Sequence, residues 1–595
     1  MTKTRKGEPV RLGFVVPIAV SLLLPSFTGA QQPQTFSETA HVELVLVDVL
    51  VTDRDGTPVL DLKREDFTLY VDGSPQELDQ FSAPFATRQT GQDVSGTTRR
   101  EPGRPTQLTG PQGSSDHLLV IYLEDHNLLP MGRHRALTQL TEVLDQRSNS
   151  RTQVMVAAYS GTVDIVLPPT RSRRRVSKVL AEKMFYGSQA LLNDRETEEI
   201  LRTLKLALEN DVEELLLLFI PPDRIMDMAC PNTLNYLARV HAQQVYGWVE
   251  SSALALQEFA RSLSIFPGQK TLIHVSDGFP LVAGQEAVEY LVSLCDGSAL
   301  NQGIESRSIL ACCPPARYFS SAALMELQGF NTVRLWDRVA ADANRNRVTI
   351  YSLQASGLQA PRAGTVSSVR TTGSTEFAAR MNDQDPLFMM ADETGGRAIL
   401  NTNDFQPDLN QMLADQGLRY ELAFQPDRPA DGKVHRIRLE VDRGGARPSY
   451  RKSYAAETVS DKTTSRVLGT LYHDQEDDQH GVRVKAEVRA DTSKKMSDVD
   501  VEIRVPLKKL FLLPEGDSQK GLVTVMLTAR DERGATLPVG SQTIPFKVEA
   551  GDEDEFFKYV VRVPLRRGHN WQFAVGLRDD LANTASYVTA RLEVP

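Results

Sequence analysis

Residues 118–125, LLVIYLED, constrain the fold of this chain more than any other stretch. They form an apolar run of strand length that ends in an acidic residue and leads into a segment with helical spacing. An open α/β sheet carries carboxylates at its ligand-binding edge in this way. A second apolar run, residues 271–275, ends in Ser276, Asp277 and Gly278. Two strand ends that each carry an Asp predict one site built from separated pieces of chain.

Strand and helix patterns alternate through residues 116–418. Helical patterns occupy 131–145, about 195–218, about 251–266 and 332–345. Strand patterns occupy 154–159, 162–167, 271–275 and 348–353, and a helix, strand and helix follow over about 386–418. Repeated βα units predict an α/β fold with a doubly wound, mainly parallel sheet that helices cover on both faces.

Both flanks of this region have β character. Residues 38–84 and 419–456 contain strand-like runs between Asp-Gly turns, and 466–595 predicts a C-terminal β-sandwich. Residues 85–115, rich in Gly, Pro, Ser and Thr, predict a linker, and the polar stretch through 461–465 predicts a separator. The strands at 41–82 are too few to close a core by themselves. We therefore expect them to share a sandwich with 420–454, with the α/β domain inserted between them.

Size and charge exclude some classes of protein. A chain of 595 residues is too long for a single core, so two to four domains are expected. The formal net charge of -10 argues against a nucleic-acid partner, because phosphate binding requires a concentrated basic face. The chain contains no nucleophile elbow, zinc-protease helix or phosphate loop, so no enzymatic activity is predicted.

The N-terminus has the pattern of a signal peptide, residues 1–30. Basic residues precede an apolar stretch at 12–27, and Thr28, Gly29 and Ala30 supply the small residues of a cleavage site. The sequence thus predicts export to the periplasm, the cell surface or the medium. An uncleaved anchor is the alternative, although Pro17 and Pro25 interrupt the apolar stretch. No later segment is expected to span a membrane.

Four cysteines lie in one region, which we interpret as an insertion at about 221–331. They are Cys230, Cys295, Cys312 and Cys313. In an exported chain they predict disulfides, and because adjacent cysteines rarely bond each other, the last two are expected to pair outward, in either order. A zinc site is the alternative, but the adjacent pair lacks the usual spacer.

Several pieces of the chain, in this order, resemble the bacterial VWFA-related domain family first named from acidobacteria. The matching pieces are 47–82, the strand with Asp125, FPGQKTLIHVSDGFP at 266–280, 343–358, ADETGGRAILNTNDF at 391–405, and 420–441. The resemblance covers roughly residues 40–460. It implies an exported protein with a von Willebrand factor A-like domain and β modules that serves adhesion or protein interaction.

The resemblance also implies a cation site of the A-domain type. Such a site uses Asp-x-Ser-x-Ser, a Thr on a second loop and an Asp on a third. Asp125 matches the first position, Asn127 stands at the first hydroxyl position, and Asp277 matches the third loop. Leu129 cannot replace the second hydroxyl, and Ser188 and Thr170 are both candidates for the second-loop Thr. Oxygen ligands of this kind predict a weak Mg²⁺ or Ca²⁺ site.

The alternative is that Asp125 and Asp277 cap the helices that follow them. Glu124 and His126 are expected to face away from the site, the histidine in an exposed loop. The first functional hypothesis is a protein that docks a protein partner at the edge carrying these residues, with a cation as a bridge. The second is a structural component of a surface assembly with a degenerate, metal-free A-like domain.

Overall fold

The computed structural model describes residues 44–84, 117–146, 152–185, 196–197, 199–203, 230–293, 325, 327–358, 373–427, 430–491, 495–549 and 555–595. The chain forms two compact units. The first contains Leu44–Arg261 and Phe266–Glu457, and the second contains Ser262–Ile265 and Thr458–Pro595. The signal peptide predicted at 1–30 and the linker predicted at 85–115 lie outside the described residues.

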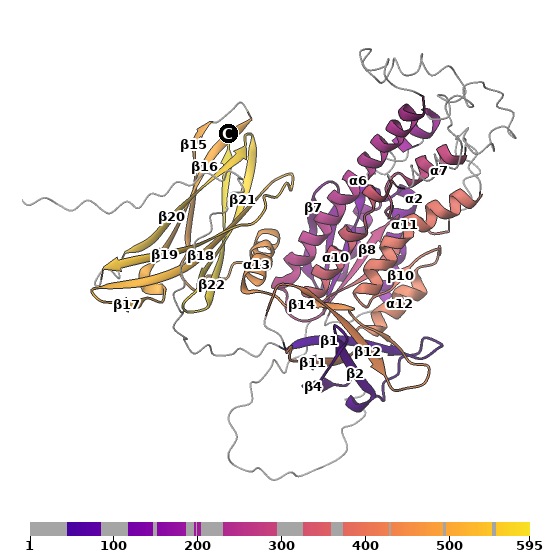
Figure 1. Cartoon of the computed structure of the whole chain (residues 1–595), viewed down its shortest axis with the longest axis horizontal. Coiled ribbons are helices and arrows are strands. Elements are labelled where there is room, and N and C mark those ends of the chain that lie inside the picture. Colours follow the sequence, from indigo (N-terminus) through magenta and orange to yellow (C-terminus); the bar gives the residue numbers. More distant parts are fainter. Residues whose placement is uncertain are drawn as a thin grey trace, which may run out of the picture. The chain divides into compact units, whose positions relative to one another are not determined.

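A six-stranded sheet forms the centre of the first unit (Figure 1). Its strands, in spatial order, are β10 (Ala398–Ile399), β9 (Val348–Gln354), β8 (Lys270–Ser276), β5 (His117–Leu123), β6 (Thr152–Tyr159) and β7 (Val163–Thr170). All neighbours pair in parallel except β6 and β7. The central strands β8 and β9 are buried at every position, as parallel strands covered on both faces must be. The predicted α/β class and the mainly parallel sheet are therefore confirmed.

Helices pack on both faces of this sheet. The described helices of the domain are α2 (Pro130–Gln146), α3 (Arg173–Lys183), α6 (Cys230–Ser262), α7 (Gln285–Ser293), α10 (Val333–Arg345), α11 (Gly373–Glu393) and α12 (Gln406–Asp415). Of these, α7 packs against α11. Alternate residues of β5 point to opposite faces. Leu119 and Ile121 share a core with side chains of α2, α3 and α12, whereas Tyr122 on the other face contacts Phe259 of α6.

A two-sheet β module joins both flanks of the α/β domain. One sheet contains β13 (Arg447–Ser449), β1 (Val45–Thr52), β11 (Tyr420–Phe424) and β4 (Gln80–Ser82). The other contains β14 (Ser453–Ala455), β12 (Val434–Val441), β2 (Phe67–Val71) and β3 (Ser74–Gln76). Strands from both ends of the inserted domain thus pair directly, β1 with β11 and β2 with β12. Val49, Leu69, Leu422 and Leu439 belong to the single core between the sheets.

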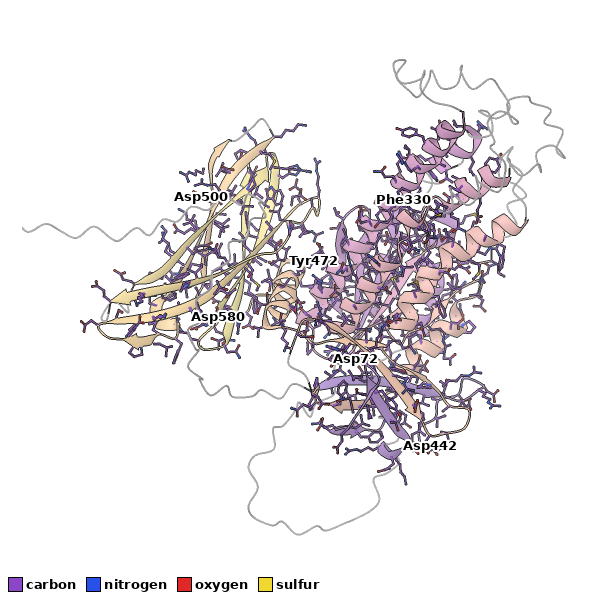
Figure 2. The ribbon with its side chains drawn as sticks, viewed as in Figure 1. Asp72, Phe330, Asp442, Tyr472, Asp500 and Asp580 are labelled. Atoms are coloured by element: carbon purple, nitrogen blue, oxygen red, sulfur yellow. The ribbon has the colours of Figure 1, made fainter. Side chains whose placement is uncertain are left out.

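The module's tight turns depend on side chains as well as on glycine. Asp72, labelled in Figure 2, lies between β2 and β3 with a left-handed φ of 49°. Its Oδ1 accepts a hydrogen bond from the N–H of Arg436, and its Oδ2 lies 2.8 Å from Nδ1 of His435. Asp tolerates this backbone region better than most residues, and these contacts hold it there.

The second unit is a helix and a β-sandwich. The helix α13 (Val459–His473) precedes eight strands, β15 (Arg483–Asp491), β16 (Met496–Pro506), β17 (Leu513–Glu515), β18 (Ser518–Asp531), β19 (Gly540–Glu549), β20 (Phe556–Arg566), β21 (His569–Asp579) and β22 (Thr584–Val594). Strands β15, β16 and β20 form one sheet, and the other strands form the second. Val501 and Phe573, from different sheets, belong to one core.

Two expectations about local structure were wrong. The range 221–331 is not an insertion in its described part, because α6 packs on the sheet and β8 lies between β5 and β9. The polar residues 461–465 are helical, since Thr458 and Asp461 form a capping box that starts α13. The helix, strand and helix expected over about 386–418 are present as α11, β10 and α12, and α11 begins earlier than expected, at Gly373. Among the described residues, no helix combines the length and apolar character needed to cross a bilayer.

Candidate functional site

The loops after β5, β8 and β9 meet along one side of the sheet, which we call the carboxyl edge (residues 124–133, 276–280 and 355–358). Parallel pairing brings the ends of β5 and β8 together. The N–H of Glu124 donates to the carbonyl of Val275 (3.0 Å), and the N–H of Asp277 donates to the carbonyl of Asn127 (3.2 Å). The chain segments that carry Asp125, Asn127 and Asp277 are therefore neighbours, although about 150 residues separate them in sequence.

Asp125 is buried and paired with two basic side chains. Its side chain is 2% exposed, and its Oδ1 lies 3.1 Å from Nη2 of Arg133, which is fully buried. Its Oδ2 lies 3.4 Å from Nζ of Lys183, at the end of α3. Burial raises the pKa of Asp125 above its ordinary value, and the two cations oppose that shift. A basic group thus lies next to each carboxylate oxygen.

Asn127 and Asp277 join the two loops to each other. The Nδ2 group of Asn127 donates to the carbonyl of Gly278. The Oδ2 atom of Asp277 accepts a hydrogen bond of 2.6 Å from the N–H of Leu129, the residue before α2. Gly278 has a φ of +116°, and a Cβ there would lie 2.6 Å from the carbonyl oxygen of Asp383, so the turn requires glycine.

Asp125 and Asp277 do not cap the helices that follow them in the sequence. Asp277 binds the N–H of the residue before α2, across the edge, and Asp125 pairs with side chains of α2 and α3. Thr170 is excluded as a ligand because β7 is antiparallel, so its last residue lies opposite Val154 near the start of β6. Ser188 lies outside the described residues. The side chains of Cys230, Cys295, Cys312 and Cys313 also lie outside them, so the disulfide and zinc predictions stay predictions.

Glu124 and His274 form a buried polar pair directly behind the carboxyl edge. Oε2 of Glu124 lies 3.7 Å from Nε2 of His274, and both side chains are shielded from solvent. Ser252 of α6 donates to Oε1 of Glu124 (3.1 Å). Burial raises the pKa of Glu124 well above its ordinary value and lowers the pKa of His274 to about 3, so the histidine is neutral near pH 7. The pair orders α6 against the sheet.

His126 is not the exposed loop residue that the sequence suggested. Its ring lies 6.1 Å from that of Tyr159 and 6.0 Å from that of Trp248 on α6. Trp248 in turn contacts Phe279, which stacks on His274. Burial lowers the pKa of His126, as expected for an imidazole between aromatic rings.

Three large apolar side chains are exposed around the carboxyl edge. They are Met131 (79% exposed), Phe185 (81%) and Leu358 (61%). Met131 belongs to the first turn of α2, and the ring of Phe185 lies 5.8 Å from that of His134 on the same helix. Leu358 follows β9, and its N–H donates to Oδ1 of Asn403, which also accepts from Arg135 of α2. The three side chains thus belong to neighbouring elements of one surface.

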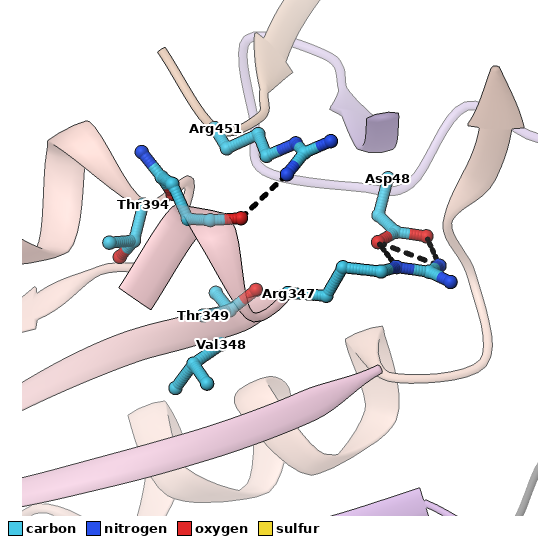
Figure 3. A pocket seen from close by; sticks show the side chains of 7 residues that line it. Asp48, Arg347, Val348, Thr349, Thr394 and Arg451 are labelled. Atoms are coloured by element: carbon cyan, nitrogen blue, oxygen red, sulfur yellow. Dashed lines mark hydrogen bonds and ion pairs between the residues drawn. The ribbon is translucent and has the colours of Figure 1, made fainter. Parts of the chain in front are cut away.

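A small polar cavity lies elsewhere in the unit, where the β module meets the opposite edge of the sheet (Figure 3). Asp48 of β1 and Arg347, which precedes β9, line it and form a two-pronged ion pair. Arg451 donates to the carbonyls of Asn344 and Leu46, and burial lowers its pKa to about 10. The cavity holds about one water molecule, so it is too small for a substrate.

The residues of the carboxyl edge do not fit a divalent cation. Mg²⁺ and Ca²⁺ require six or more oxygen ligands, but Arg133 and Lys183 stand beside the Asp125 carboxylate. Among the described residues, no group of three or more His, Cys, Asp or Glu side chains is placed to hold a metal ion. Neither basic residue could be assigned to the site from the sequence, because eight and 58 positions separate them from Asp125 and no motif links them.

Comparisons with known proteins add little. No family model matches the chain, and no curated protein matches it. An aerotolerance-related membrane protein from Bacteroides fragilis is 13% identical over 50% of this chain and 99% of that chain, with a TM-score of 0.20. The hypothetical protein BatB from Bacteroides thetaiotaomicron is 10% identical over 50% of this chain and 96% of that chain, with a TM-score of 0.19. A candidate β-galactosidase from Bacteroides fragilis is 18% identical over 19% of this chain and 16% of that chain, with a TM-score of 0.14. Because these TM-scores are all below 0.5, none of the likenesses carries an argument about fold or function.

Proposed function

We propose that this chain is an exported, non-enzymatic binding protein of the von Willebrand A type, which docks a protein partner on the carboxyl edge of its sheet. The observation that carries the proposal is the exposure of Met131, Phe185 and Leu358 around that edge. Soluble proteins rarely expose several large apolar side chains together unless the surface meets a partner. Ligands of open α/β sheets also bind at this edge.

Two features of the edge suit docking better than catalysis. Glu124 and His274, the buried titratable pair behind the edge, are both shielded from solvent, and Ser252 of α6 donates to the Glu124 carboxyl group. Met131, Phe185 and Leu358 are exposed, and apolar side chains contribute to protein interfaces through burial. Export remains a prediction from residues 1–30.

Site-specific photo-crosslinking in the native cell tests the docking proposal. A photo-reactive residue replaces Met131 in one variant, and the matched control carries it at Val434, which is exposed (47%) on the β module. We expect one discrete protein adduct from position 131 and none from position 434. No adduct from position 131, or the same adduct from both positions, contradicts the proposal.

A third variant addresses the structural alternative. Phe511 is 52% exposed in the C-terminal unit, and it can carry the same photo-reactive residue. Adducts from position 511 without any from position 131 would favour a structural component whose α/β edge makes no contact. Adducts from position 131 alone support docking at the carboxyl edge.

A further inference from the structure

The carboxylate of Asp125 is bounded by protein cations on both oxygens. Arg133 Nη2 lies 3.1 Å from Oδ1, and Lys183 Nζ lies 3.4 Å from Oδ2. Arg133 is completely buried, and the side chain of Lys183 is 15% exposed. Arg133 also donates from Nη2 to the backbone carbonyl of Asp125, at 3.4 Å. An uncompensated carboxylate at this depth would be strongly unfavourable, so these contacts determine whether the edge can form.

The same two contacts tie three elements together. Asp125 begins the short 3₁₀ turn Asp125–Asn127 after β5, Arg133 lies in α2, and Lys183 ends α3. In a metal-dependent site, a bound divalent ion performs this task by collecting oxygen ligands from separate loops. A dication placed against the Asp125 carboxylate would also be repelled by the adjacent guanidinium and ammonium groups.

We infer that this chain carries its own cation at the carboxyl edge: Arg133, assisted by Lys183, organises the edge around Asp125 in place of a divalent metal ion, and docking needs no metal. This inference rests on the proposed function for its statement about docking. A guanidinium suits the role because it keeps its charge at all physiological pH values and offers several donors in a fixed plane. Unlike a bound ion, it cannot be removed by a chelator.

Thermal unfolding of the full mature chain tests the built-in cation. The wild type, Arg133→Met, Arg133→Lys and the double variant Asp125→Asn/Arg133→Met are each melted in EDTA and in millimolar Mg²⁺, Mn²⁺ or Ca²⁺. Lys178→Met is the matched control, because Lys178 is a basic residue of α3 whose side chain is 76% exposed. Calorimetric titration with the same metal salts measures binding directly.

We expect the Tm of the wild type and of Lys178→Met to be the same in EDTA and in each metal. Arg133→Met should lower Tm by several degrees because it leaves a buried carboxylate with one cation fewer. Arg133→Lys should lie between the two, and the double variant should be more stable than Arg133→Met and should not respond to metal.

Three results would overturn the inference. They are saturable stabilisation of the wild type by a divalent ion, an Arg133→Met variant as stable as the wild type, and a double variant no more stable than Arg133→Met. If Arg133→Met does not fold, folding of the double variant supports the inference, and failure of both assigns Arg133 a packing role.

The two proposals fail separately. Stabilisation of the wild type by a metal would contradict the inference that Arg133 replaces a metal ion, while crosslinks from position 131 would still support docking. Absence of those crosslinks would remove docking and leave the ion pairs as a structural device. Repeating the crosslinking in EDTA tests whether docking depends on a metal ion. Loss of the adduct in EDTA contradicts metal-independent docking.

Discussion

Arg347 and Asp48, 299 positions apart in the chain, form a two-pronged ion pair that connects the turn before β9 to strand β1 of the β module. Arg347 has a left-handed φ of 55°, an unfavourable region for a residue with a side chain. Its guanidinium also lies 3.2 Å from Glu421 on β11. Arg347 therefore connects the inserted α/β domain to β1, which precedes the domain in the sequence, and to β11, which follows it.

The first prediction concerns the strength of this coupling. A double-mutant cycle with Asp48→Asn and Arg347→Met should give a coupling free energy of ~1–3 kcal/mol, because both side chains are largely buried. Urea unfolding followed by the fluorescence of Trp248 and Trp336 measures it. The control is the exposed pair of Lys178 and Glu182, for which the coupling should be roughly 0.5 kcal/mol or less. Equal coupling for the two pairs would show that the junction is not held electrostatically.

The second prediction concerns Glu124 and pH. Burial raises the pKa of this carboxyl well above its ordinary value, so from about pH 5 up to that raised pKa the folded state holds more protons than the unfolded state. The wild type should therefore lose stability as pH rises through this range, by up to roughly 1.4 kcal/mol per pH unit. Glu124→Gln, which imitates the protonated form, should lack this loss, and its advantage over the wild type should grow with pH. Parallel stability curves for the two proteins would refute the raised pKa of Glu124.

The third prediction concerns Lys270, a buried residue of β8. Burial, with a contribution from Arg347, lowers its pKa to about 7, whereas a lysine in the unfolded chain titrates near its ordinary value of 10.5. Between these values the unfolded state holds more protons, so this residue makes stability rise with pH from about 7 to about 10. Lys270→Met should reduce that slope, measured by denaturant unfolding at several pH values. An unchanged slope would mean that the ammonium stays charged, held by the carbonyls of Gly268 and Asn346.

The fourth prediction uses two glycines of the same unit. A Cβ at Gly396 would overlap the carbonyl oxygen of Ile350 on β9, whereas a Cβ at Gly417 would meet nothing within 4 Å. Gly396→Ala should lower the free energy of unfolding by about 2 kcal/mol or more, because backbone must move. Gly417→Ala should change it by less than about 1 kcal/mol. Equal stabilities in urea unfolding would show that the loop before β10 yields more easily than its packing indicates.

Some elements were visible in the sequence without any tertiary information. The run from Leu118 to Leu123 is apolar at every position, and this predicts a strand buried on both faces. The capping pair Thr458 and Asp461 also marks a helix start in the sequence. We interpreted the stretch as a separator because its residues are polar. Local patterns of this kind depend on neighbours in the chain, so the sequence carries them.

Local sequence patterns were enough to predict the alternation of strands and helices, the parallel strands β5 and β8, and the acidic residues at their ends. The contacts that those acidic residues make depend on how the helices pack. Asp125 pairs with Arg133 and Lys183 because α2 and α3 pack on the same face of the sheet. Thr170 lies away from the carboxyl edge because β7 runs antiparallel to β6. The physical reason is that charge is compensated through space, by whichever helix the packing of the core brings to the carboxylate.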